Sequence, residues 1–434
     1  MRNSYIYKID STEDFTNRLI AKSKSTNYIS VLLSNQVVKS KSLPNKYINY
    51  DLIAGVEKLE SIESNEDSFQ ALRKFHNKYS DWMFGYFSYD LKNEIEELFS
   101  ENQDGIEANN LSFFIPKFVF LLCGDKLEVL TFQDKNYTDK LFNSLTAHKL
   151  SKRHQILLKQ KESPADYLCK IDKIKKHIQR GDIYEMNYCL EYYSNDVSLH
   201  AEDLFVHLNK ICKTPFAGFL NINEHYILSA SPERFIRKEG NNIISQPIKG
   251  TIKRGSSINE DKKLIYKLEN SQKDISENVM ITDLVRNDLS ITAKKSSVNV
   301  DEFCKVYTFE KVHQMISTIS SQINSNIHFT DLLESVFPMG SMTGAPKIKA
   351  MELIEKYEEF KRGLFSGSIG YITPEGDFDF NVIIRTILYN ASTKYLSVGV
   401  GGAITIKSDP QQEYEECLLK IRPILEALNH NIDD

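Results

Sequence analysis

The strongest constraint on the fold is a pair of strand-like runs separated by a short turn. Residues 367–372 and 380–387 are rich in β-branched and aromatic residues, and residues 373–377 between them carry Pro and Gly. A turn of this kind between two apolar runs is typical of an antiparallel hairpin. We therefore expect antiparallel pairing in the last third of the chain.

Size and composition narrow the class of protein. A chain of 434 residues is too long for one small core and suits two lobes or one large α/β body. The net charge of −5, without a long basic run, argues against a nucleic-acid partner. The apolar run at residues 118–123 is far short of a membrane span, and the first residues lack an apolar signal core. We expect no membrane association.

The cysteines and the linker composition refine this picture. Six cysteines are scattered without close pairs, which indicates reduced thiols in a cytoplasmic protein. A Lys-rich stretch, residues 148–162, resembles a solvated linker or polar helix. We place a boundary there and expect an N-terminal lobe at 1–150 and a second domain at 163–430. Ser163, Pro164 and Asp166 predict a helix start, and Gly181 its end.

The most informative short segment is residues 247–251, Pro-Ile-Lys-Gly-Thr, which follows an apolar strand at 242–244. It places Lys249 in a short turn, where a lysine can act as an amine nucleophile. The normal lysine pKa is roughly 10.4, so the amine must be desolvated or lie near another cation to be neutral. An ordinary surface lysine is the alternative.

A first acidic helix is predicted at residues 260–285. Its buried face is expected to carry Leu264, Leu268, Ile275 and Val279. Asp274 and Glu277 lie three residues apart, so their carboxylates emerge side by side.

The last helix is predicted to begin at Asp409, with Pro410 in its first turn and Gln412 completing a capping box. Glu413, Glu416 and Lys420 share one face of this helix. Carboxylates from two such helices would suit Mg²⁺, which also takes oxygens from an anionic substrate. The alternative is two solvated helix faces with ordinary Glu–Lys pairing.

Several ordered motifs together resemble the chorismate-utilising enzymes. They are Ser-Pro-Glu-Arg-Phe at 231–235, Pro-Ile-Lys-Gly-Thr at 247–251, the acidic helix segment 277–288, Gly-Ser-Met-Thr-Gly-Ala-Pro-Lys at 340–347, Ile-Arg-Thr at 384–386 and Gly-Val-Gly-Gly at 399–402. The resemblance implies an α/β (α+β) fold: a large antiparallel β-sheet sandwich with helices outside and an interwoven smaller N-terminal lobe. The segment 163–430 would then be the chorismate-binding catalytic domain.

Within that family, a lysine at this position resembles the branch that aminates chorismate to 4-amino-4-deoxychorismate, on the route to 4-aminobenzoate and folate. The resemblance implies that Lys249 attacks C2 of chorismate and expels the C4 hydroxyl, after which ammonia adds at C4. Glu233 is the implied proton donor, and burial would supply the raised pKa that this role needs.

The resemblance also implies the ligand contacts. Glu277 and Glu416 resemble Mg²⁺ ligands, with Asp274 and Glu413 behind them through water. Arg385 resembles the clamp for a substrate carboxylate. The remaining implied substrate contacts are Gly401, Gly402, Lys420, Thr251 and Tyr371; for Tyr371, a core aromatic is the alternative.

The chain departs from the family pattern at several points. Family members that use ammonia tend to carry Gln where this chain has Glu185, and water-using relatives carry a Lys base; the role of Glu185 stays open. His313 lies one position early for the family histidine, so a packing role is at least as plausible. Residues 32–35 and 215–217 resemble parts of a tryptophan pocket, and whether tryptophan binds is open.

No Gly-x-Cys-x-Gly elbow with a downstream His-x-Glu is present, and the resemblance implies a separate glutamine amidotransferase subunit that supplies ammonia. Direct use of free ammonia is the alternative. Two rival functions remain. Anthranilate synthase component I would also eliminate pyruvate from chorismate. A non-catalytic module that binds chorismate or an amino acid would keep the fold without the chemistry, which the set Lys249, Glu277, Glu416 and Arg385 argues against.

Overall fold

The computed structural model describes residues 1–35, 48–145 and 155–430. The strands are β1 (Asn3–Lys8), β2 (Tyr28–Leu33), β3 (Leu52–Ser64), β4 (Met83–Phe87), β5 (Leu111–Cys123), β6 (Lys126–Thr131), β7 (Lys159–Gln160), β8 (Glu185–Ser194), β9 (Phe216–Ile222), β10 (His225–Ser231), β11 (Arg234–Glu239), β12 (Asn242–Gln246), β13 (Ile248–Lys253), β14 (Asn299–Thr308), β15 (Val312–Gln322), β16 (Gly344–Ala345), β17 (Ser368–Ile372), β18 (Phe378–Val382), β19 (Thr386–Asn390) and β20 (Tyr395–Ile404).

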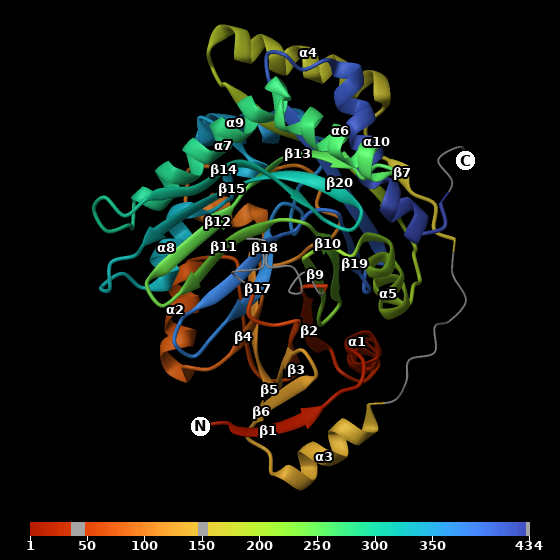
Figure 1. Ribbon diagram of the computed structural model, residues 1–434, viewed down its shortest axis with the longest axis vertical. Helices are drawn as coiled ribbons and strands as arrows, with labels where there is room; N and C mark the ends of the chain where they lie inside the picture. Colours follow the sequence, from red (N-terminus) through yellow and green to blue (C-terminus); the bar gives the residue numbers. More distant parts are fainter. Residues whose placement is uncertain (36–47, 146–154, 431–434) are drawn as a thin grey trace.

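The α-helices are α1 (Thr12–Ala21), α2 (Ser68–Tyr79), α3 (Lys135–Ser144), α4 (Pro164–Arg180), α5 (Ala201–Cys212), α6 (Ile258–Glu269), α7 (Gln272–Ser290), α8 (Phe329–Val336), α9 (Lys347–Tyr357) and α10 (Pro410–Ala427). Short 3₁₀ turns include η1 (Lys22–Ser25), η4 (Tyr89–Glu94) and η5 (Gly340–Met342). The helices lie outside the strands, with α4, α6, α7, α9 and α10 along one side (Figure 1). The expected mixed α/β fold with a large antiparallel sheet is confirmed.

The strand pairings run through the whole chain and are antiparallel. One path follows β8–β20–β19–β10–β9–β2–β3, and another follows β3–β5–β4–β17–β18–β11–β12–β15. The pairs β2–β9 and β4–β17 join strands of the first 150 residues to strands of the later segment. The N-terminal lobe therefore shares one sheet with the rest of the chain.

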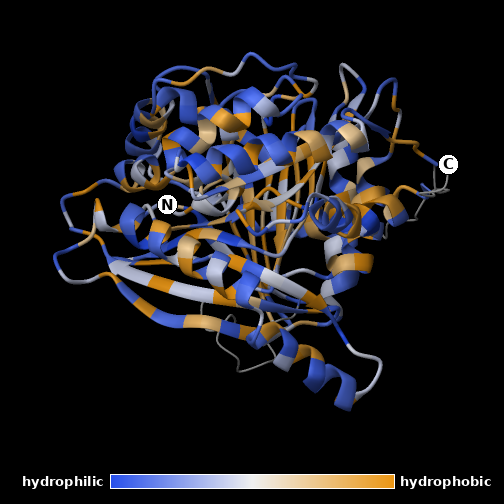
Figure 2. Cartoon of the chain, turned by 90° about the horizontal axis from the view of Figure 1, so that it is seen from above, coloured by the Kyte–Doolittle hydropathy of each residue, from blue (hydrophilic) through white to orange (hydrophobic). Residues whose placement is uncertain are grey.

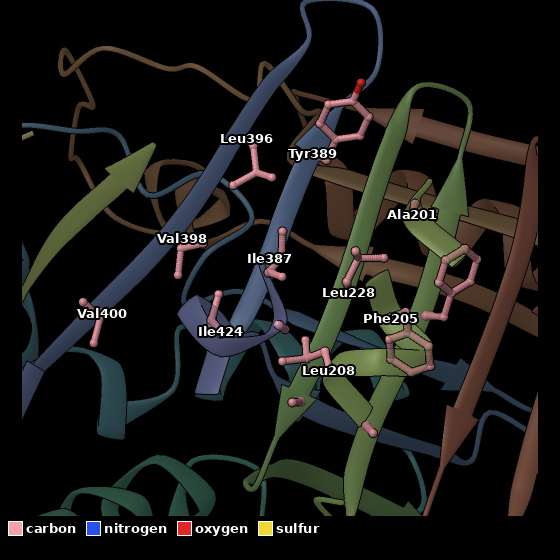
Figure 3. Close-up of a cluster of buried hydrophobic side chains, with 14 of the residues drawn as sticks. Ala201, Phe205, Leu208, Leu228, Ile387, Tyr389, Leu396, Val398, Val400 and Ile424 are labelled. Carbon is pink, nitrogen blue, oxygen red and sulfur yellow. The ribbon is translucent and has the colours of Figure 1, made fainter. Parts of the chain in front are cut away.

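Two apolar cores fill this architecture. Hydrophobic residues concentrate on the interior strands, whereas the outward helix faces are mainly hydrophilic (Figure 2). In one core, α5 and α10 pack on β10, β19 and β20. The side chains that meet there include Phe205, Leu208, Leu228, Ile387, Val398 and Ile424 (Figure 3). Burial of such side chains is the main stabilising term, at roughly 1.5–3 kcal/mol each.

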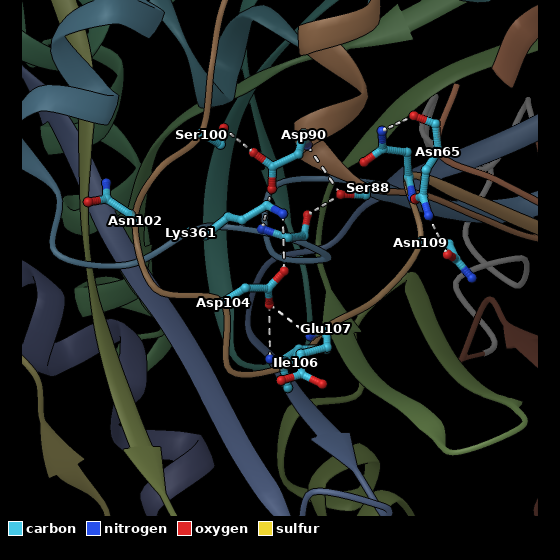
Figure 4. Close-up of polar contacts among 12 residues, drawn as sticks. Asn65, Ser88, Asp90, Ser100, Asn102, Asp104, Ile106, Glu107, Asn109 and Lys361 are labelled. Atoms are coloured by element: carbon cyan, nitrogen blue, oxygen red, sulfur yellow. Dashed lines mark hydrogen bonds and ion pairs between the residues drawn. The ribbon is translucent and has the colours of Figure 1, made fainter. Parts of the chain in front are cut away.

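A polar network joins the two segments at another point. Asp104 pairs with Lys361 at 3.2 Å and accepts the backbone N–H groups of Ile106 and Glu107 at 3.1 and 2.8 Å. Asp90 accepts the hydroxyl of Ser100 at 2.6 Å (Figure 4). The loop after β4 is thereby fixed to the segment before β17.

The predicted hairpin is confirmed, but its second run is not one strand. β17 pairs with β18 from Ser368↔Val382 to Ile372↔Phe378. The chain then leaves the strand after Val382 and enters β19 at Thr386, and Arg385 between them has a φ of 51°. Apolar composition continues through the break, which is why the sequence predicted an unbroken strand over residues 380–387.

The single helix predicted at residues 260–285 is also wrong. The helix ends at Glu269 and restarts at Gln272, where Ser271 caps α7 by accepting the N–H of Asp274. Val279, predicted to be buried, is 42% exposed. The buried stripe of α7 instead alternates apolar with polar side chains: Glu277, Asn278, Ile281, Thr282, Val285, Asp288 and Leu289. Hydrophobicity alone could not reveal a stripe of that composition.

Other predicted ends are confirmed. Ser163 caps α4, which stops at Gly181 in the left-handed region, and Asp409 caps α10 by accepting the N–H of Gln412. Residues 148–154 of the predicted linker lie outside the described residues. Within the described ranges, no helix combines the length and apolar character needed to cross a bilayer.

Candidate active site

Lys249 lies in a strand, not in the predicted loop. It belongs to β13, where the pairing with β15 shifts register between Ile248 and Thr251. Gly250 follows with a φ of +91°, and a Cβ at this position would lie 2.9 Å from the Cβ of Asp274. The glycine therefore serves both the backbone conformation and the close approach of α7 to β13.

The Lys249 amine is buried, as predicted, but it is not neutral. Its Nζ lies 3.0 Å from Glu185 Oε1 in an ion pair with both side chains buried. Burial lowers the pKa of Lys249, but the nearby carboxylates of Glu185, Glu277 and Glu233 more than offset it and raise the pKa above its usual value. The resting site holds an ammonium surrounded by acids.

Glu185 is positioned by the Gly-Ser-Met-Thr-Gly-Ala-Pro-Lys segment. β16 of that segment pairs with the start of β8, with Ala345 opposite Glu185 and Gly344 opposite Met186. A Cβ on Gly344 would lie 2.2 Å from the carbonyl oxygen of Glu185, so no larger residue fits there. Glu185 Oε2 is buried and has no hydrogen-bond partner within the described residues.

Glu233 has the properties expected of a proton donor. It lies at the turn between β10 and β11, and burial raises its pKa to about 7, against the opposing effects of Ser341 and Lys249. The neighbouring arginines bind other carboxylates: Arg234 pairs with Asp379 at 2.9 Å and Arg237 with Glu239 at 3.0 Å. The alternative in which Glu233 merely neutralises one of these arginines is thus not supported.

The predicted metal ligands come together where α7 meets α10, around a lysine. Lys273 Nζ lies 2.8 Å from Glu413 Oε1, 3.6 Å from Glu416 Oε2 and 3.9 Å from Glu277 Oε1. Glu277 Oε1 is buried without a hydrogen-bond partner among the described residues.

These carboxylates differ in their titration. Burial raises the pKa of Glu277 to about 7, whereas Lys420 holds the pKa of Glu416 at about 2, with Lys273 and Lys249 adding to the effect. Asp274 lies one turn before Glu277, against Gly250.

This donor set suits a hard cation in chemistry and charge. Over residues 1–35, 48–145 and 155–430, however, no three His, Cys, Asp or Glu side chains are arranged to hold a metal by themselves. The acids fit Mg²⁺ only if Lys273 moves away and a substrate supplies further oxygens.

A cleft with four basic residues in its lining, Lys213, Lys311, Arg385 and Lys420, lies next to this cluster through Lys420, which pairs with Glu416 at 2.8 Å. It has about 630 Å³ of open space, and its walls include Arg385, Lys420, Gln314 and Pro232. Within the described part of the chain, the Arg385 guanidinium has no hydrogen-bond or ion-pair partner. Its charge lowers the pKa of Glu233, as does that of Lys249, so Glu233 lies close to both residues.

Gly401 and Gly402 bring β20 close to α10 at the same cleft. Lys420 Nζ donates to the Gly401 carbonyl at 2.8 Å. A Cβ on Gly402 would lie 3.6 Å from both Glu413 Oε2 and Lys420 Nζ. Gly402 thus lies next to Glu413 and Glu416, and the predicted contact of both glycines with a substrate carboxylate stays a prediction.

Two predicted substrate contacts, Tyr371 and Thr251, are not among the residues that line this cleft, although Thr251 adjoins its wall at Gln314. Tyr371 lines a separate pocket of about 500 Å³ together with Leu33, Phe216 and Asn381, so its assignment to the substrate cleft is wrong. Thr251 is exposed on β13, within 3.5 Å of Gln314. The separate pocket brings together the two segments that resemble a tryptophan site, because Leu33 of β2 is the register partner of Ala217 of β9.

His313 has a packing role. Its ring is fully buried, and its nitrogens lie 2.9 Å from Asp261 and 2.9 Å from Thr308. Because Asp261 begins the second turn of α6, the histidine ties β15 to that helix. Sequence reasoning missed the central residue of the acidic cluster, Lys273, although its spacing of four from Glu277 was a usable signal.

The family follows from comparison with known proteins. The sequence pattern of the chorismate binding enzymes matches residues 20–426. This chain therefore belongs to the family of chorismate binding enzymes.

Two bacterial relatives carry the name aminodeoxychorismate synthase component 1. The Escherichia coli protein is 39% identical over 60% of this chain and 56% of its own length. The Salmonella typhimurium protein is 33% identical over 80% of this chain and 76% of its own length. An aminodeoxychorismate synthase of Arabidopsis thaliana is 39% identical, but the match covers only 28% of that protein. The chain thus spans little more than half the length of the E. coli relative.

Solved structures confirm the fold. Anthranilate synthase component I from Streptococcus pneumoniae superposes with a TM-score of 0.73, covering 91% of each chain at 22% identity. The menaquinone-specific isochorismate synthase of E. coli superposes with a TM-score of 0.77 over 99% of this chain and 94% of its own, at 16% identity.

Proposed function

We propose that this chain is an enzyme that aminates chorismate to 4-amino-4-deoxychorismate. The observation that carries the proposal is the buried lysine of β13, with a carboxyl of raised pKa close to it and a cation-lined cleft alongside. Anthranilate-forming relatives usually have Ala where this chain has Lys249. The names of the two bacterial relatives support the same reaction.

Chorismate is held by its two carboxylates in the cleft of Arg385 and Lys420. Arg385 presents a planar fork that matches a carboxylate, and Lys420 adds a second charge. Glu277 and Glu416, with Asp274 and Glu413 behind them, would hold Mg²⁺, which would supply a divalent charge to the ring carboxylate. Gly402 leaves space beside Glu413, Glu416 and Lys420, where a Cβ would lie 3.6–3.7 Å from their polar atoms.

The substitution then proceeds in two balanced steps. The Lys249 amine forms a bond to C2, both ring double bonds shift by one position, and the C4 hydroxyl leaves as water with a proton from Glu233. Ammonia next forms a bond to C4, the C2–N bond to Lys249 breaks, and the proton lost by ammonia returns to the Glu233 carboxylate. One hard substitution is thereby split into two allylic ones.

Lys249 must lose a proton before it attacks. In the resting site, Lys249 donates to Glu185 Oε1 at 3.0 Å, so this oxygen is placed to accept the proton. Since Glu233 must be protonated and Lys249 must be neutral, the productive form is a minority at any pH. This pairing predicts a bell-shaped dependence of rate on pH.

The ammonia comes from a second protein. The two bacterial relatives are named component 1, which supports a partner component, and we propose a glutamine amidotransferase subunit in that role. The product leads toward 4-aminobenzoate and folate. We place the reaction in the cytoplasm, where the six unpaired cysteines stay reduced.

The deciding experiment uses the purified chain with chorismate and Mg²⁺. With ammonium, we expect chorismate to disappear and 4-amino-4-deoxychorismate to form, identified by mass spectrometry. Without ammonium, intact-protein mass spectrometry should detect an adduct that maps to Lys249. Fluorescent anthranilate as the product would assign the chain to the other branch, and no chorismate consumption would support a binding module.

A further inference from the structure

Lys273 is the residue of the acidic cluster that the proposed reaction does not use. It lies on α7, one turn before Glu277, and reaches across to Glu413 and Glu416 on α10. A single ammonium thus contacts three of the four acids assigned to the metal. No other described residue links these three carboxylates.

Lys273 does not form hydrogen bonds with all three acids. Its Nζ donates a hydrogen bond to Glu413 at 2.8 Å, whereas Glu416 and Glu277 lie 3.6 and 3.9 Å from the same atom. Glu277 Oε1 stays buried without a hydrogen bond, and its side chain is 9% exposed. Mg²⁺ binds carboxylate oxygens at about 2.0–2.1 Å, so it would need the oxygens that Lys273 now contacts.

The Lys273 side chain is also exposed enough to move from the cluster into solvent. Its side chain is 40% exposed, and Glu416 beside it is 42% exposed, so the ammonium lies at the solvent edge of the cluster. The flexible four-carbon stem can carry the charge into water. Glu277 and Glu413 are buried and stay in place.

We propose that Lys273 is an internal cation that neutralises the acidic cluster in the metal-free protein and withdraws when Mg²⁺ binds. The lysine contact and the metal exclude one another, because both require the same carboxylate oxygens and their charges repel. The lysine thereby prevents Glu277 and Glu413 from facing each other unpaired, whereas Glu416 also pairs with Lys420 at 2.8 Å. This inference rests on the magnesium site proposed above.

The first test measures Mg²⁺ binding by calorimetry in the full-length chain, without chorismate. We expect Lys273→Gln to bind Mg²⁺ about tenfold or more tightly than the wild type, since a competitor that fills the site nine-tenths of the time lowers the apparent affinity by that factor. Lys267→Gln on α6 removes the same charge from an exposed position and should bind as the wild type does.

The possible outcomes distinguish the proposed competition by Lys273 from the existence of the magnesium site. Wild-type binding that Lys273→Gln leaves unchanged or weakens overturns the competition but keeps the magnesium site. No binding to either protein overturns both. Lys273→Arg keeps the charge and should bind Mg²⁺ no more tightly than the wild type.

A second test needs no variant. A lysine-acetylating reagent, followed by peptide mass spectrometry, reports how accessible each amine is in the wild type. We expect Mg²⁺ to increase labelling at Lys273 and to leave Lys267 unchanged. Labelling of Lys273 that does not respond to saturating Mg²⁺ would overturn the proposed withdrawal.

Discussion

Two polar clusters in this molecule differ in how completely their buried carboxylate oxygens are hydrogen-bonded. Around Asp90 and Asp104, every carboxylate oxygen has a partner: Ser100 and the Gly363 N–H on Asp90, and backbone N–H groups and Lys361 on Asp104. In the active site, Glu185 and Glu277 each leave one buried oxygen without a hydrogen bond. Since buried polar groups are normally satisfied, incomplete pairing marks the cluster kept for a ligand.

The largest effect should come from removing Lys249, the proposed nucleophile. Lys249→Arg keeps a positive charge opposite Glu185 but offers no usable amine. We expect the rate of aminodeoxychorismate formation to fall more than about 10³-fold, the scale on which loss of a catalytic nucleophile acts. Lys253→Arg, at the exposed end of the same strand, should retain full activity. Chorismate-consumption kinetics and intact mass distinguish the two, and a fully active Lys249→Arg would make this lysine structural.

Removal of the proton donor should rank next. Glu233→Gln should slow the reaction by about 10²–10⁴-fold, because general acid catalysis is lost. In the wild type, the rate should rise with pH up to about 7 and then level off, because loss of the Glu233 proton offsets the further gain in neutral Lys249 amine. The glutamine variant should lack this break and continue to rise above pH 7. Glu239→Gln on β11 serves as the matched control, and a break that persists in Glu233→Gln belongs to another group.

A smaller change should follow from the ion-pair partner of the nucleophile. Glu185→Gln removes one of the carboxylates that raise the pKa of Lys249, while Glu277 and Glu233 remain. The neutral amine then appears at lower pH, so the alkaline rise in adduct formation should move to lower pH. Adduct formation measured across pH checks this, with Glu191→Gln on the same strand as control. An unmoved or more alkaline limb would falsify the charge coupling.

The smallest effect on chemistry is expected in the satisfied cluster. Asp104→Ala leaves two backbone N–H groups and Lys361 without their acceptor, which should cost about 1–3 kcal/mol of unfolding free energy. Urea denaturation measures this loss. The turnover of the folded protein should not change, because the network lies outside the cleft. An Asp104→Ala variant of unchanged stability but reduced turnover would show that this cluster serves activity and not stability.

Much of the fold was predictable because its signals are local. The caps at Ser163 and Asp409 and the hairpin turn before β18 depend on neighbouring residues. The strand break after Val382 and the break between α6 and α7 could not be predicted, because they depend on which strands and helices pack there. Motif residues at 233, 249, 277 and 416 predicted a common site, but only the structure shows that Lys249 pairs with Glu185 and that Lys273 lies among the acids. Tyr371 was misplaced because a strand aromatic gives no sign of which pocket it faces.

The break between β18 and β19 has a mechanical consequence. β18 pairs with β11 and β17, whereas β19 pairs with β10 and β20, so residues 383–385 form the seam between two regions of the sheet. Arg385, in its left-handed conformation, is part of that seam and also extends into the cleft. A ligand bound to this guanidinium is therefore in direct contact with the backbone segment that links the two regions of the sheet. A substitution at Arg385 would change ligand binding and this segment of the backbone together.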